Sequence, residues 1–77
     1  MRRMTLKKLY DVNGVKVGIY QIEADRAYYI AVLIDGLNLE VWGMGETAYQ
    51  ALLDARERWN DNFGGFNPFR EALSLFP

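Results

Sequence analysis

The sequence Tyr-Asp-Val-Asn-Gly-Val-Lys-Val at residues 10–17 decides how the fold begins. Asn13 and Gly14 tolerate positive φ angles, which both central residues of a two-residue type I′ hairpin require. Apolar and polar residues alternate on either side of this pair, as in strands that bury one face. A two-residue turn pairs residue 12 with 15, 11 with 16 and 10 with 17, so that apolar side chains or opposite charges meet. We therefore predict an antiparallel hairpin.

Two further strands are expected after this hairpin. The second strand runs to about residue 23, and a turn at Asp25-Arg26 leads into the apolar segment 28–34. With that turn, Ile19 lies opposite Val32. Asp35-Gly36 predicts a third turn, and residues 39–42 a fourth strand. The result is a four-stranded antiparallel meander, whose register depends on the loop lengths.

A helix is predicted after the strands. Thr47 and Gln50 have the spacing of a capping box, in which the Thr47 hydroxyl accepts from the Gln50 amide and the Gln50 side chain reaches back. An apolar stripe at helical spacing follows at residues 48, 51, 52, 55 and 59. Gly64-Gly65 is expected to end the helix, and Asn67-Pro68 to begin a short second helix through about residue 75. The predicted fold is a single α+β domain over residues 1–77, with one helix packed on one face of the sheet and a short C-terminal helix.

Strand alternation sorts the predicted sheet into two apolar faces. The expected core face is compact and rich in β-branched residues: Tyr10, Val12, Val15, Val17, Ile19, Ile30, Val32, Ile34, Leu39 and Val41. The expected second face carries larger side chains: Leu9, Tyr20, Ile22, Tyr29, Ala31, Leu33, Trp42 and Met44. This second face is too apolar to be solvated. Its candidate partner-binding residues are Tyr20, Tyr29, Leu33, Trp42 and Met44.

Four kinds of cover are possible for the second face. The C-terminal segment carries Phe63, Phe66, Phe69, Leu73 and Phe76, which can fold back over it. A homodimer through this face or its edge strand is the second possibility, and a different protein is the third. A stacked nucleic-acid base or a small ligand is the fourth.

The composition argues against catalysis. The 77 residues contain neither histidine nor cysteine, which excludes Ser-His-Asp and Cys-His arrangements and the usual zinc sites. Carboxylates at the expected strand ends are more typical of turns and soluble edges than of a Mg²⁺ or Ca²⁺ site. We therefore predict no enzymatic activity, no metal and no cofactor.

Charge and hydropathy limit the kinds of partner that we expect. Residues 1–16 carry five Lys or Arg against one Asp, while the whole chain has a net charge of −1. This balance argues against nucleic acid, although the basic N-terminal strand leaves it open. The longest apolar run, residues 27–34, is too short to span a membrane. A cytoplasmic protein is expected.

Residues 19–59 resemble the N-terminal domain of HicB-like antitoxins. Tyr29-Ile-Ala-Val-Leu-Ile-Asp35 is similar to the second strand and loop of that family, and Gly45-Glu-Thr-Ala-Tyr-Gln-Ala-Leu-Leu-Asp-Ala55 is similar to its Gly-Asp-Thr helix start. Ile34-Asp35-Gly36-Leu37 replaces the Pro-Asp-Leu-Pro-Gly loop of the family, and we expect no DNA-binding module. The resemblance implies a partly RNase-H-like sheet with a packed helix, and the sequestration of a toxin.

Together these features predict a non-catalytic protein that occludes another protein, such as a toxin or a defence-system component. Such a protein would act like an antitoxin or like an anti-defence protein of the anti-CRISPR type, and would be encoded by a phage or mobile element. The alternative is a small nucleic-acid-binding protein that uses the basic N-terminal strand and exposed aromatic residues.

Overall fold

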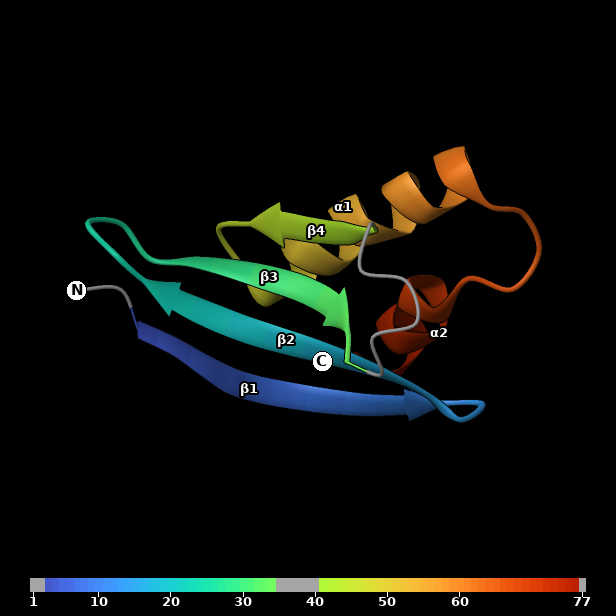
Figure 1. Cartoon of the computed structure of the whole chain (residues 1–77), viewed down its shortest axis with the longest axis horizontal. Coiled ribbons are helices and arrows are strands. Elements are labelled where there is room, and N and C mark those ends of the chain that lie inside the picture. The colour runs from blue at the N-terminus through green and yellow to red at the C-terminus, as the bar shows by residue number, and fades with distance from the viewer. Residues whose placement is uncertain (1–2, 35–40, 77) are drawn as a thin grey trace.

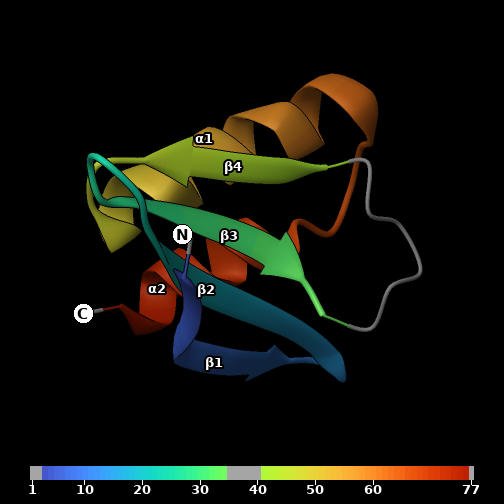
Figure 2. The same ribbon diagram turned by 60° about the vertical axis from the view of Figure 1, so that its left-hand side comes forward.

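The computed structural model describes residues 3–34 and 41–76, which form one antiparallel sheet and two helices (Figure 1). The strands are β1 (Arg3–Val12), β2 (Val15–Glu23), β3 (Tyr28–Leu33) and β4 (Trp42–Gly45), and the helices are α1 (Ala48–Asn62) and α2 (Pro68–Leu75). The strand order β1-β2-β3-β4 is that of a meander, which Figure 2 shows from the side. The predicted α+β fold is confirmed.

The β1–β2 hairpin forms as predicted. Asn13 and Gly14 have φ angles of 55° and 82°, and the partners are Val12 with Val15, Asp11 with Lys16, and Tyr10 with Val17. The Gly14 amide also donates to Asp11 Oδ1 at 3.1 Å. This register is the one that a two-residue turn at Asn13-Gly14 dictates.

The predicted register between β2 and β3 was wrong by one residue. Ile19 lies opposite Ala31, not Val32, and the last pair before the loop is Ile22 with Tyr28. The connection is thus longer than a two-residue turn at Asp25-Arg26. Because side chains alternate between faces, a slip of one residue exchanges the two faces of the whole strand.

The fourth strand lies later than predicted. The expected turn at residues 35–36 and the first two residues of the expected strand, including the predicted core residue Leu39, lie outside the described residues. In the described part of the chain, Val41 is buried and β4 begins at Trp42.

The predicted start of α1 is confirmed, but its end differs. Thr47 Oγ1 accepts from the Gln50 amide at 3.1 Å, and Gln50 Oε1 reaches back to the Glu46 amide at 3.1 Å. The helix ends at Asn62, and its cap residue Phe63 has extended backbone angles. The glycine that adopts a positive φ, Gly65 at 75°, comes two residues after that cap. Gly64-Gly65 therefore turns the chain and does not cap the helix.

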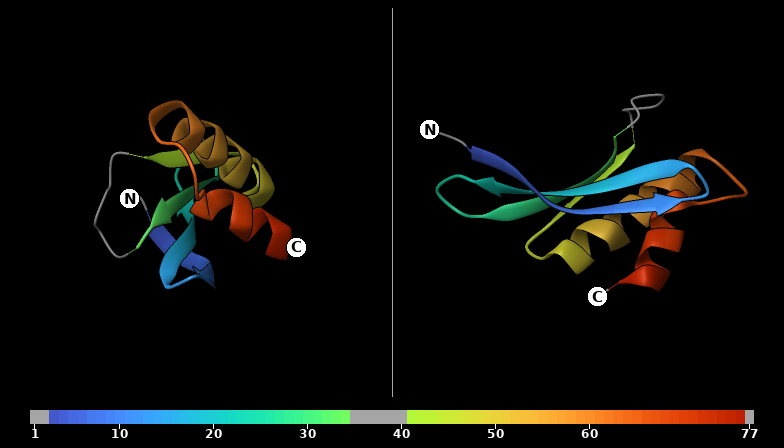
Figure 3. Two further views of the ribbon diagram at one scale, coloured as in Figure 1. Left: turned by 90° about the vertical axis from the view of Figure 1, so that its right-hand side faces the viewer. Right: turned by 90° about the horizontal axis from the view of Figure 1, so that it is seen from below.

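Asn67 begins α2 as predicted and also ties it to α1. Its Oδ1 accepts from the amides of Phe69 and Arg70 at 3.1 and 3.3 Å. Its Nδ2 donates to the Arg56 carbonyl at 3.1 Å and to Asn60 Oδ1 at 2.9 Å. This buried side chain directs α2 back beside α1, so both helices cover the same face of the sheet (Figure 3).

The core lies between that face and the two helices. It consists of Tyr10, Val12, Val17, Ile19, Ala31, Leu33, Val41, Ala51, Leu52, Ala55, Phe69 and Ala72. Gly43 marks the closest approach, because an added Cβ there would collide with backbone atoms of Ala51 and Ala55. The helix α1 therefore rests directly on β4, and small residues make that contact possible.

Candidate functional site

The face of the sheet turned away from the helices is apolar across all four strands. We call it the open face and define it from the strand registers and the alternation of side chains. Three cross-strand rows compose most of it: Met4–Ile22–Tyr28, Leu6–Tyr20–Ile30–Met44 and Leu9–Gly18–Val32–Trp42. Ile34 follows at the end of β3. No described element covers this face (Figure 3).

Many of these side chains are exposed. Six large apolar residues of the open face have between 36% and 64% of their surface accessible: Met4, Leu6, Leu9, Ile34, Trp42 and Met44. Ile22 is an exception at 3%, although it belongs to the same face. A monomer rarely leaves so continuous an apolar surface in water unless it is a site of interaction.

A β-bulge in β1 brings Leu6 and Leu9 to the same face. Leu6 pairs with Tyr20 and Lys8 pairs with Ile19, so Lys7 is an extra residue between consecutive pairs. In a strand without a bulge, side chains three positions apart point to opposite faces. The bulge therefore extends the open face along the whole length of β1.

Gly18 lies in the middle of the open face, and side chains of neighbouring residues fill the space above it. A Cβ added at Gly18 would lie 2.6 Å from Ile34 Cδ1 and 3.3 Å from Tyr20 Cε1. These two side chains thus occupy the space above the glycine backbone. Gly18 therefore leaves no gap between its neighbours in this face.

The outer edge of β4 is closed by α1. Asp54 Oδ2 accepts from the Met44 amide at 3.0 Å and forms an ion pair with Arg58 Nε at 3.2 Å. The Arg58 guanidinium in turn lies 5.2 Å from the centre of the Trp42 ring. These contacts satisfy an edge amide and hold Trp42 at the rim of the open face.

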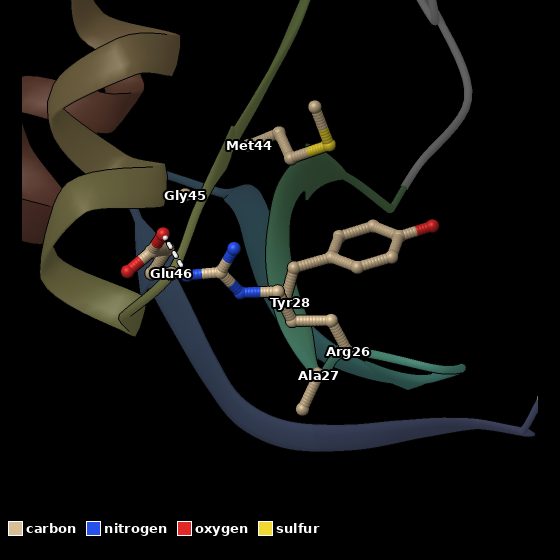
Figure 4. A pocket seen from close by; sticks show the side chains of 6 residues that line it. All are labelled: Arg26, Ala27, Tyr28, Met44, Gly45 and Glu46. Atoms are coloured by element: carbon tan, nitrogen blue, oxygen red, sulfur yellow. Dashed lines mark hydrogen bonds and ion pairs between the residues drawn. The ribbon is translucent and has the colours of Figure 1, made fainter.

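A shallow pocket of about 300 Å³ lies beside the open face, near the β2–β3 loop (Figure 4). Tyr28 and Met44 form its apolar side, and the ion pair between Arg26 and Glu46, at 2.9 Å, lies across from them. The pocket thus adds a polar, charged rim to one corner of an otherwise apolar surface.

The structure brings together three of the five predicted partner-binding residues. Tyr20, Trp42 and Met44 lie on the open face. Tyr29 and Leu33 lie on the opposite face, against the helices, so their placement on the same surface was wrong. The cause is the one-residue slip between β2 and β3.

Sequence reasoning missed several members of the open face. Ile30, Val32 and Ile34 were assigned to the core, and Met4, Leu6 and Tyr28 were not assigned to either face. A longer β2–β3 loop in the prediction would have placed the β3 side chains on the correct faces. The bulge in β1, in contrast, has no evident signal in the sequence.

The C-terminal segment does not cover the open face, contrary to one of the four possibilities. Phe69 is fully buried in the core, and α2 packs beside α1 on the other side of the sheet. Trp59 contacts both Phe63 and Phe69, and its Nε1 donates to the Phe66 carbonyl at 2.9 Å. The aromatic residues of this segment therefore belong to the helix layer.

Two searches of the described residues bear on other kinds of site. Within residues 3–34 and 41–76, no group of three or more His, Cys, Asp or Glu is arranged to hold a metal ion. None of the described helices is long and apolar enough to cross a membrane.

Comparison with known proteins gives a viral relative. The chain is 61% identical over 75 residues to "Uncharacterized protein ORF77" of Acidianus filamentous virus 1, and the match covers 97% of each chain. The chain belongs to the same family as this viral protein. No protein-family model matches the chain, and no solved structure matches it.

Proposed function

We propose that the protein is a non-catalytic inhibitor that binds another protein through the open face and occludes a functional surface of that partner. The observation that carries this proposal is the open face itself: a four-stranded apolar surface with exposed Met, Leu and Trp side chains, opposite the helices. Aromatic residues and methionine are enriched at the centres of protein interfaces. Tyr20, Trp42 and Met44 are the proposed anchors.

A toxin or a component of a defence system is the proposed partner. A small protein with a viral relative of nearly equal length suits a role that needs one binding surface and no active site. The resemblance of residues 19–59 to HicB-like antitoxins supports the same class of partner. The absence of histidine and cysteine from the sequence supports a role without catalysis.

Charge placement favours a protein partner over nucleic acid. Arg3 forms an ion pair with Glu23 at 3.9 Å, and Lys8 lies 5.6 Å from the centre of the Tyr10 ring. Both of these residues share the register of the helix-covered face. The basic residues on the side of the exposed tryptophan, Lys16 and Arg58, each lie beside a carboxylate of the same chain, Asp11 and Asp54. A surface that binds single-stranded nucleic acid needs stacking side chains next to basic side chains that contact phosphate.

The test is capture of the partner from a lysate of cells in which the protein is naturally expressed. The tagged protein is compared with the double variant Tyr20→Ser/Trp42→Ser and with Leu75→Ser, a control at a 56% exposed position on α2. We expect a partner protein to be retained by the wild type and the control, and reduced at least about tenfold with the double variant, as for interface anchors. Thermal melts establish that all three are folded.

Two results would contradict the proposal. One is loss of the partner with Leu75→Ser but not with the double variant, which would move the site to the helices. The other is loss of binding on nuclease treatment together with a steep decline in salt, which would favour the nucleic-acid alternative.

A further inference from the structure

From the open face we infer that a second copy of this chain covers it when no partner is bound, so that the protein regulates its own binding surface. This inference rests on the proposed function, because the same surface serves both interactions. The pair is formed by two sheets packed face to face, with the helices of each copy on the outside. Exchange of the second copy for the partner then controls inhibition.

The exposed apolar area is sufficient for such a pair. The six exposed side chains of the open face together expose the equivalent of between two and three complete residues. At roughly 200 Å² for a large apolar side chain, this is about 550 Å² on each copy. Two copies would therefore remove about 1,100 Å² from water, which clears the roughly 1,000 Å² needed for a biological interface and is typical of a weak, reversible one.

The shape of the open face suits another sheet. Ile34 and Tyr20 fill the space above Gly18, so the glycine leaves no gap at the centre. Two sheets of the same twist pack with their strands about 30° apart and their inner side chains interdigitated. A copy of this chain supplies that twist and the same pattern of side chains, and a two-fold axis makes the contact closed.

The charges of the open face allow self-association. Strand alternation places Asp11 and Lys16 on this face, opposite each other at the hairpin end. Near Trp42, Arg58 is paired with Asp54 at 3.2 Å. Each of these positive charges thus has a negative neighbour on its own copy, so two open faces meet without net repulsion.

The structure disfavours the alternative contact, in which two copies pair through the edges of their sheets. On the edge of β4, Asp54 of α1 accepts from the Met44 amide, so this amide is not available to a second copy. The other edge, β1, is interrupted by the bulge at Lys7 and carries Lys8 next to it. Bulges and lysines are devices that discourage edge pairing.

Sedimentation equilibrium from micromolar to sub-millimolar concentration tests the inference. The variants Leu9→Lys and Met44→Lys alter β1 and β4, at positions that are both 47% exposed. Leu75→Lys on α2 is the matched control, at 56% exposure. We expect a monomer–dimer equilibrium for the wild type and the control. In Leu9→Lys and in Met44→Lys the dissociation constant of the dimer should rise at least about tenfold, because each variant places a charge in an apolar interface. Thermal melts check that each monomer is folded.

Tryptophan fluorescence provides a second measurement. In a Trp59→Phe background the remaining tryptophan is Trp42, which lies on the open face and is 36% exposed. Its emission should shift to shorter wavelength as the protein concentration rises through the dissociation constant. Amide exchange of Leu9 and Asp11, on the edge strand, should not change over the same range.

A monomer at all concentrations would overturn the inference, as would dissociation by Leu75→Lys alone. Slowed exchange confined to β1 amides would also overturn it, since that result indicates edge pairing. Failure of the proposed function has a different signature. A dimer that obeys the predictions above but captures no partner sensitive to Tyr20→Ser/Trp42→Ser leaves the pairing intact and removes the inhibitor role.

Discussion

The two faces of the sheet are both apolar, yet their side chains differ in size where α1 lies on β3 and β4. The face under the helices contains Gly43 and Ala31 on its strands and meets Ala51 and Ala55 of α1. The open face carries Trp42, Met44, Tyr20, Leu6 and Leu9 in the corresponding rows. Small residues allow a helix backbone to lie on a strand, whereas large residues present area to a flat partner. Apolarity alone therefore does not identify the internal face, but the small residues Ala31 and Gly43 mark the side of β3 and β4 that meets α1.

The largest effect should come from filling the closest contact on the helix-covered face. Gly43→Ala adds a Cβ that would collide with the backbone of α1, and would lie 2.7 Å from Ala55 Cα. Backbone atoms cannot move aside as a flexible side chain can, so we expect a loss of about 3 kcal/mol or more in the free energy of unfolding. Urea denaturation measures this loss.

Gly64→Ala is the control for that substitution. A Cβ added at Gly64 meets nothing within 4 Å, and its φ is not positive. We expect a change within about 0.5 kcal/mol, as for an unconstrained surface site. Equal losses at the two glycines would mean that the contact between α1 and β4 is looser than described.

A smaller effect should separate the two faces directly. Leu33→Ala truncates a side chain that is 8% exposed under the helices, and should cost about 2–3 kcal/mol through lost burial and a cavity. Met44→Ala truncates a 47% exposed side chain on the open face and should cost under about 1 kcal/mol in the monomer. Thermal melts at concentrations where the protein is monomeric make the comparison. A reversed order would return Leu33 to the outer surface, where alternation in the sequence had placed it.

The smallest effect should come from the start of α1, which lies outside both faces. Thr47→Ala removes the hydroxyl that accepts from the Gln50 amide at 3.1 Å. We expect a loss of about 1 kcal/mol, the usual contribution of a helix N-cap. The midpoint of urea denaturation measures it, and Thr47→Ser is the control, because serine retains the accepting oxygen. An unchanged midpoint in Thr47→Ala would show that the cap contributes nothing to stability.

Sequence reasoning predicted the local features well and the long-range ones less well. The Asn13-Gly14 turn, the Thr47 cap and the Asn67 cap are set by neighbours within a few residues, and all three are confirmed. The register of β3 depends on how many residues the β2–β3 loop contains. The predicted and the observed loop lengths both place apolar side chains of β3 toward the helices. The choice is made by the helices, which pack against the side of β3 that carries Ala31 and Leu33 and leave Ile30 and Val32 on the other side.

The same distinction explains the result for the candidate site. Tyr20, Trp42 and Met44 were placed together because β2 and β4 keep the predicted alternation. Tyr29 and Leu33 were added through β3, and the slip removed them. A search of the sequence for paired small residues, such as the glycines at 43 and 45, would have indicated where the helix lies and hence which side of β3 is internal.

The bulge at Lys7 has a consequence for how such a protein can change in length. Leu6 lies opposite Tyr20 and Lys8 opposite Ile19, so a gene that lost the codon for Lys7 would still encode the same cross-strand partners. Loss of a codon elsewhere in β1 would shift the strand on one side of the deletion by one residue. Every side chain in that part of the strand would then point to the other face. Strand β1 thus has one position at which an in-frame deletion leaves the cross-strand partner of every other residue unchanged.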